Sequence, residues 1–326
     1  MTYRHTFSPV RLAALGVLAC GISAGPAAAQ QYPSQNITFI VAFAPGGVAD
    51  TVARLVGQKL SERLGQSVVV ENRGGAGGNI GARFVANAPP DGYTVLVTTT
   101  ALAINDTVFK NKGYDTADLR TVAIAASTPE LLAVHPSNPA KTLGEFVRAA
   151  KEKPINFGTA GVGTGSYIAA EYFFHEIAKI KTTHVPFSGG APVVAAAVGG
   201  HIDLVAVSLP SAVAQINEGA LRGLGVANPT RAPAVPSVPT YAEAGYPNFY
   251  AASWVGFFVP TKTKDQIVDK LNTEVNAILA EPAVQEKLKT IGFDAIRKSR
   301  ADASSYFESE VKTWGNMART IGLSVN

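Results

Sequence analysis

The chain is poor in cysteine and in charge. It holds 326 residues with a single cysteine, Cys20, which excludes intrachain disulfides, zinc ribbons and iron–sulfur clusters. Only 16% of the residues are charged and the net charge is +4, without a long run of Lys or Arg, so we expect no nucleic-acid partner. Beyond the N-terminus, no apolar run reaches the ~18 residues that a membrane-spanning helix needs. Apolar residues make up 47% of the chain, enough for the cores of two domains.

Residues 1–29 are typical of a secretory signal peptide. Arg4 and Arg11 come first, an apolar stretch follows, and the small residues Ala27–Ala29 close the segment, in the order of a signal's three regions. Cleavage near Ala29 leaves a chain without cysteine, which suits an oxidising compartment. Two alternatives stay open: a lipoprotein lipidated at Cys20, or a buried N-terminal helix.

From Asn36 onward, short apolar runs alternate with amphipathic segments of helical spacing. The runs are apolar throughout rather than at every second residue, which indicates strands buried on both faces of a sheet. Strands separated by single helices favour parallel pairing. The expected class is therefore α/β. The expected strands cover residues 37–43, 67–71, 93–98, 131–134, 155–159, 183–187, 202–207, 221–227 and 252–259, and two helices over 265–291 (interrupted near Pro282) and 301–321 close the chain.

The order of elements predicts two α/β lobes with a cleft between them. The chain is expected to cross into the second lobe near 131–134 and to return near 253–259. Lobe 1 would then comprise residues 30–131 plus 253–326, and lobe 2 residues 132–252. Five prolines between Pro229 and Pro247 predict a stiff, extended connection, because proline fixes φ and lacks an N–H donor.

Most catalytic signatures are absent from the sequence. It contains neither a phosphate-binding Gly-x-x-x-x-Gly-Lys nor a Gly-x-Ser-x-Gly nucleophile motif, and His175-Glu176 lacks the second histidine of a zinc protease. We expect no catalysis, no cofactor and no metal site. Asp50 can be a general base or simply an acid that favours a helix N-terminus. A secreted enzyme using Asp50 or a histidine stays open as an alternative.

Three expected strands end in glycine-bearing loops that lead into helices: Pro45–Gly47, Gly161–Ser166 and Ser188–Gly190. Glycine lets a backbone approach a ligand closely, and a helix N-terminus can hold an anion without a cationic side chain. In parallel sheets such loops gather at the carboxyl ends of the strands. The alternative is that these glycines only make tight turns. Hydroxyls suited to a carboxylate lie nearby at Thr98, Thr99, Thr100, Thr159, Thr164 and Ser166.

From about Tyr32 to the C-terminus the chain resembles a known family, the substrate-binding proteins of tripartite tricarboxylate transporters, often called Bug proteins. Many ordered segments carry the resemblance together, which makes it far more specific than any one glycine loop. The matching segments are YPSQNITFIVAFAPGGVADTVARLV, VVVENRGGAGGNIGA, APPDGYTVL, HVPFSGGAPVV, GGHIDL, VPTYAEAGYPNF and SWVGFFVP.

The resemblance implies a periplasmic two-lobed binding protein of the Venus flytrap kind, type II-like, with a mainly parallel sheet in each lobe. It implies a monomer that captures a small carboxylate, a di- or tricarboxylate or an aromatic one, and delivers it to a pair of integral-membrane permease subunits. A receptor that presents its ligand to a membrane sensor remains an alternative. The expected ligand-binding residues are Phe43, Pro45, Gly46, Gly47, Asp50, Thr98, Thr99, Thr100, Gly161, Gly163, Thr164, Ser166, Gly189, Ala191 and Ser208.

The sequence departs from the family pattern in its second half. Gly165 and Tyr167 replace a common proline and histidine, and Ser188 replaces a lysine. Near Ser208, an acid that often follows in relatives is missing. A cleft acid would suit an ammonium group, so its absence favours a ligand without an amine. Tyr167 can stack on an aromatic ligand or pack within the protein.

Overall fold

In the computed structural model, which describes residues 1–3 and 32–325, the first strand, glycine loop and helix form as the sequence predicts. The apolar run after Asn36 is strand β1 (Ile37–Val41), and helix α1 (Val48–Leu64) begins after Gly47. The helix ends at Gly65, whose left-handed φ of 67° a side chain would strain. Beyond its first three residues, the predicted signal peptide, with Cys20, lies outside the described residues.

The remaining elements follow in regular alternation. The strands are β2 (Val68–Asn72), β3 (Thr94–Thr99), β4 (Leu119–Val134), β5 (Ile155–Thr159), β6 (Thr182–Pro186), β7 (Leu204–Ser208), β8 (Arg222–Val226), β9 (Ala252–Pro260) and β10 (Asp294–Ala295). The helices are α2 (Asn79–Ala86), α3 (Ala101–Val108), α4 (Leu143–Glu152), α5 (Gly165–Tyr172), α6 (Gly190–Val198), α7 (Val213–Asn217), α8 (Asp265–Leu279), α9 (Pro282–Thr290) and α10 (Arg300–Thr320). Shorter helical turns are η1 (Ala76–Gly78), η2 (Thr116–Asp118), η3 (Phe173–Ala178) and η4 (Leu209–Ser211).

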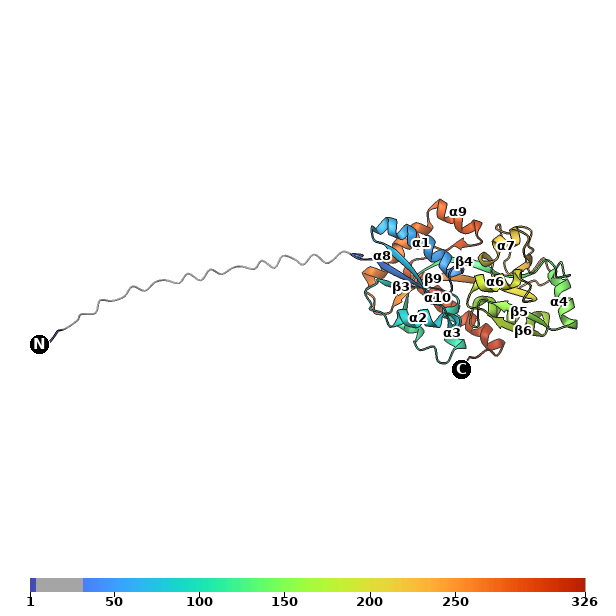
Figure 1. Cartoon of the computed structure of the whole chain (residues 1–326), viewed down its shortest axis with the longest axis horizontal. Helices are drawn as coiled ribbons and strands as arrows, with labels where there is room; N and C mark the ends of the chain where they lie inside the picture. Colours follow the sequence, from blue (N-terminus) through green and yellow to red (C-terminus); the bar gives the residue numbers. More distant parts are fainter. Residues whose placement is uncertain (4–31, 326) are drawn as a thin grey trace. The chain divides into compact units, whose positions relative to one another are not determined.

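The sheet has two halves with the same strand arrangement. In the first, β1 pairs in parallel with β2 and β3, and β9 lies antiparallel between β3 and β4. In the second, β5 pairs in parallel with β6 and β7, and the end of β4 lies antiparallel between β7 and β8. We call these halves, with their helices, the first and second lobes; in Figure 1, β3, α1 and α2 lie apart from β5, β6 and α4. The expected two-lobed α/β class, with a mainly parallel sheet in each lobe, is confirmed.

Strand β4 belongs to both halves of the sheet. The expected strand covered only 131–134, whereas β4 runs for 16 residues from Leu119. Its pairing with β9 ends at Pro129, and its pairing with β7 begins at Glu130 opposite Ser208. Proline cannot donate to a sheet ladder, which fits its place where the strand changes partners. The polar residues in the first part of the strand concealed its length from the sequence pattern.

Two further segments differ from the sequence prediction: the helix after the threonines 98–100 and the proline-rich segment. Helix α3, directly after the threonines 98–100, was not expected at all. The proline-rich segment is not extended: it contains several turns, Val226 forms a bridge with Thr240, and Val235 and Tyr241 are buried in the second lobe. Apolar residues between the prolines gain more from packing than from an extended course. None of the helices in the described part of the chain has the length and apolar character to cross a membrane.

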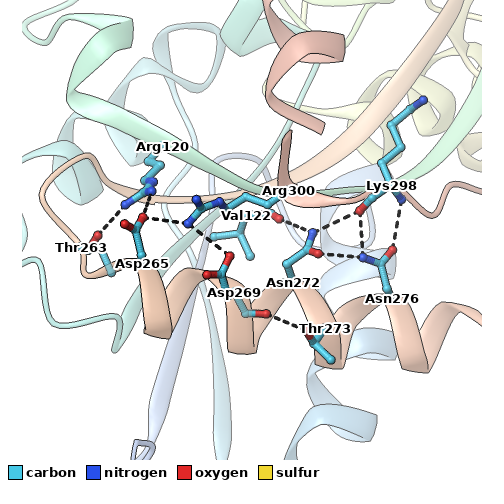
Figure 2. A network of polar contacts seen from close by, with 10 residues as sticks. All are labelled: Arg120, Val122, Thr263, Asp265, Asp269, Asn272, Thr273, Asn276, Lys298 and Arg300. Carbon is cyan, nitrogen blue, oxygen red and sulfur yellow. Dashed lines mark hydrogen bonds and ion pairs between the residues drawn. The ribbon is translucent and has the colours of Figure 1, made fainter. Parts of the chain in front are cut away.

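A polar network fastens the start of β4 to α8 and to the chain before α10 (Figure 2). Arg120 donates to the carbonyl of Thr263 at 2.8 Å and pairs with Asp265, which Arg300 also contacts at 2.8 Å. Asn272, 8% exposed, donates to the Val122 carbonyl at 2.7 Å. The network therefore holds the first lobe's α8 against the strand that both lobes share.

Replacing Asn272 by alanine is expected to lower the free energy of unfolding by about 1–3 kcal/mol, because the buried Val122 carbonyl loses its side-chain donor. Urea unfolding followed by circular dichroism measures the effect. The matched control is Thr273→Ala on the exposed face of the same helix, which should change stability by less than about 0.5 kcal/mol. Equal losses in the two variants would show that the Asn272 contact contributes nothing particular.

Candidate ligand-binding pocket

A small pocket of about 40 Å³ lies where loops of the two lobes meet. Its wall combines apolar groups with four serines and two threonines, and contains no Arg, Lys, Asp or Glu among the described residues. Such a volume holds a few water molecules at most, so the pocket is nearly closed. The lining residues are Phe43, Gly47, Val48, Ala49, Thr99, Ala160, Thr164, Gly165, Ser166, Gly190, Val207, Ser208, Ser211 and Ser253.

Three helices begin at this pocket. The first residues of α1, α5 and α6 all line it: Val48 and Ala49, then Gly165 and Ser166, then Gly190. Neither α1 nor α6 has a side-chain cap on its N-terminus. The N–H groups of a helix start lack partners in the helix and carry partial positive charge, so three convergent starts form a pocket suited to an anion.

The first-lobe loop is held in place by Asp50. Its carboxylate accepts from the Gly46 N–H at 2.9 Å, from Arg54 at 2.9 Å and from Asn72 at 2.9 Å. Burial alone would raise the pKa of Asp50, but these hydrogen bonds outweigh it and keep the pKa below its usual range. Gly46 has a φ of 76°, a conformation that favours glycine. Asp50 thus shapes the loop, and its side chain does not line the pocket.

The second-lobe loop is shaped by threonine hydroxyls. Thr164 caps α5 by accepting from the Tyr167 N–H at 3.4 Å, and its hydroxyl donates to the Gly161 carbonyl at 2.7 Å. Thr159 bonds with His184 Nε2 at 2.8 Å, and burial lowers the pKa of His184 to about 4, so this histidine is neutral at physiological pH. The Tyr167 ring lies 4.3 Å from the His184 ring, which makes it a packing residue rather than a pocket wall.

The lobes touch around the pocket at positions where glycine leaves room. A Cβ placed on Gly189 would lie 3.1 Å from the Cβ of Ala44, and one on Gly77 would lie 2.6 Å from the Val162 carbonyl oxygen. A Cβ on Gly163 would overlap Asn105 Oδ1. Side chains at these three positions would hold the lobes apart. The glycines therefore permit the close contact between the two lobes.

The fifteen expected ligand-binding residues differ in their position relative to the pocket. Six of them line it directly: Phe43, Gly47, Thr99, Thr164, Ser166 and Ser208. The others lie behind the wall or on the loops beside it: Pro45, Gly46, Asp50, Thr98, Thr100, Gly161, Gly163, Gly189 and Ala191. Whether each contacts a ligand stays a prediction.

Sequence reasoning missed the acid behind the pocket, Glu130. It is 4% exposed and accepts from Ser208 at 3.2 Å and from Ser253, both of which line the pocket. Burial raises its pKa to about 7, against the opposing hydrogen bonds from Ser253 and Ser208. The signal in the sequence was a lone acid at the start of an apolar strand. Within the described part of the chain, the pocket wall itself lacks an acid, and the expectation of a ligand without an amine stays a prediction.

The fold and the pocket together define a class: a two-lobed α/β solute-binding protein. Comparison with known proteins agrees, because the family model described as "Tripartite tricarboxylate transporter family receptor" matches residues 52–323. The chain belongs to this family, as its resemblance to Bug proteins implied. No group of three or more His, Cys, Asp or Glu in the described residues could hold a metal ion.

Solved structures of similar proteins come from the same class. The chain is 34% identical to an R. palustris protein solved with adipate, with a TM-score of 0.87, covering 90% of this chain and 99% of that one. It is 32% identical to MatC from Rhodopseudomonas palustris with bound malate (TM-score 0.82; 88% and 99% covered). It is 29% identical to the periplasmic binding protein BugD (TM-score 0.85; 90% and 99% covered).

Proposed function

We propose that this protein captures a small carboxylate in the periplasm and delivers it to the membrane permease subunits of a tripartite tricarboxylate transporter. It acts as a monomer without chemistry of its own. Residues 30–131 plus 253–326 form the first lobe and residues 132–252 the second, and these lobes close around the ligand. The expected ligand-binding residues listed above keep that role in this proposal.

The observation that carries the proposal is the convergence of three helix N-termini on a pocket without a cationic side chain. Two similar proteins hold the dicarboxylates adipate and malate. A carboxylate suits such a pocket because backbone N–H groups and hydroxyls can satisfy its oxygens. Closure follows if the ligand makes contacts to both lobes only when they meet.

A thermal-shift screen with matched ligands tests the proposal. Dicarboxylates and aromatic carboxylates are compared with their methyl esters, which keep the carbon skeleton and lose the charge. At about a hundredfold excess over Kd, a true ligand stabilises the folded state by about 2.7 kcal/mol, which corresponds to a rise in Tm of about 5 °C. The esters should produce no shift. Equal shifts with acid and ester, or no shift with any acid, would contradict the proposal, and turnover of a bound acid would favour the secreted enzyme instead.

A further inference from the structure

A buried acid without a cation lies directly behind the pocket wall. Glu130 is 4% exposed, and no Lys, Arg or His of the described chain forms an ion pair with it. Its side-chain partners are the hydroxyls of Ser208 and Ser253. Burial of a carboxylate with hydroxyl donors alone is costly, so a donor or a positive charge brought by a ligand would lower that cost.

The protons of these hydroxyls can be assigned by counting. When Glu130 is ionised its carboxylate only accepts, so in that form Ser208 and Ser253 each direct their single proton to Glu130. Ser253 also lies 3.0 Å from the Thr100 hydroxyl, and because its own proton is used, Thr100 must be the donor there. Ser208 and Ser253 therefore donate to Glu130, and Thr100 donates to Ser253.

The consequence for the pocket is a wall that accepts hydrogen bonds. Ser208 and Ser253 both line the pocket, and each hydroxyl oxygen retains a lone pair that no described donor uses. The helix N-termini elsewhere in the same wall offer N–H donors. The pocket therefore joins a region for an anion to a region for a hydrogen-bond donor.

We propose that Glu130, acting through Ser208 and Ser253, makes this pocket prefer carboxylates that also carry a hydrogen-bond donor. The donor is a hydroxyl or an ammonium group, and the comparison is with the same acids lacking it. This inference rests on the proposed function. Glu130 is a specificity-determining residue that positions two hydroxyls and need not touch the ligand. The absence of an acid near Ser208 in the sequence does not exclude an amine, because Glu130 lies behind that serine.

Isothermal titration calorimetry at pH 8 with matched sets of acids tests the proposal. The sets are succinate, malate and aspartate; glutarate, 2-hydroxyglutarate and glutamate; and adipate, 2-hydroxyadipate and 2-aminoadipate. In every set that binds, the hydroxy or amino acid should have a Kd at least about tenfold lower than the unsubstituted acid, the value of one good hydrogen bond. The hydroxy and amino members distinguish the two kinds of donor.

Variants separate selection from general damage to the pocket. In Glu130→Gln the preference should fall below about threefold while the unsubstituted acid keeps its affinity within about threefold. Ser208→Ala, which leaves Glu130 in place, should reduce the preference partly, and Ser309→Ala on the exposed face of α10 should leave it unchanged. Unsubstituted acids that bind as tightly as their substituted partners, or an intact preference in Glu130→Gln, would overturn this inference and leave the proposed function standing. If no acid in any set binds, this inference fails, and the thermal-shift screen decides the proposed function separately.

Discussion

Replacing Gly165 by alanine is expected to raise the Kd for the carboxylate ligand by about a hundredfold or more, equivalent to about 2.7 kcal/mol. A Cβ at this position would overlap Ser253 Oγ and would lie 2.8 Å from Thr100 Oγ1 and 3.0 Å from Glu130 Oε1. Ser253 can escape only by rotating away from Glu130, which leaves a buried carboxyl short of a partner. The methyl group would also enter the wall of the pocket, which Gly165 lines.

The control for this variant is Gly144→Ala in the first turn of α4. A Cβ there meets no atom within 4 Å, so alanine should preserve ligand affinity and stabilise the protein by up to about 1 kcal/mol through helix propensity. Calorimetric titration with the strongest acid of the screen, together with the Tm of each free protein, measures both effects. A Gly165→Ala protein that binds within threefold of the wild type would refute the tight packing around Glu130.

The second large effect is a loss of stability on raising the pH, caused by Glu130. Its pKa in the folded protein is about 7, whereas the ordinary value is 4.5, so between these values the folded state binds more protons than the unfolded state. Stability therefore falls as pH rises through this window, by about 2–3 kcal/mol between pH 5 and 8 for this one group. Tyr241, the other described titratable group that acts on Glu130, has a pKa raised by burial and stays neutral throughout.

Urea unfolding of the wild type and of Glu130→Gln at pH 5 and pH 8 isolates this contribution. The two proteins share every other titrating group. The free energy of unfolding of the variant should therefore rise relative to that of the wild type by about 2–3 kcal/mol between pH 5 and pH 8. Parallel pH dependences for the two proteins would show that Glu130 titrates as an ordinary exposed acid. Fluorescence of Trp254, which is fully buried beside Ser253 in β9, offers a local second readout.

The sequence predicted the strand–loop–helix units well because local chemistry determines them. Apolar β-branched runs, Gly65 after α1 and the glycine loops before α1, α5 and α6 are all visible within a few residues of chain. Within each lobe the loops lie at the carboxyl ends of parallel strands. The strands of the two halves run in opposite directions, and the carboxyl ends of both halves meet at one pocket. The expected lobe boundaries near 131 and 253 fall close to where β4 changes partners and where β9 begins, and they stay a proposal.

What the sequence did not reveal depends on contacts between distant residues. Glu130 meets Ser208 and Ser253 from positions 78 and 123 residues away, and no local pattern encodes that meeting. The role of Asp50 was likewise ambiguous, since its partner Asn72 lies 22 residues further along. The proline-rich segment was misjudged because burial by the second lobe outweighs the local preference of its prolines.

The strand that both lobes share also contains the acid behind the pocket wall. Pro129 is the last β4 residue paired with β9, and Glu130 is the first paired with β7. If the lobes close as the proposed function requires, a hydrogen bond gained or lost at the Glu130 carboxyl acts directly on the strand that both lobes share. Binding of the solute and closure of the lobes would then be coupled through neighbouring residues of one strand.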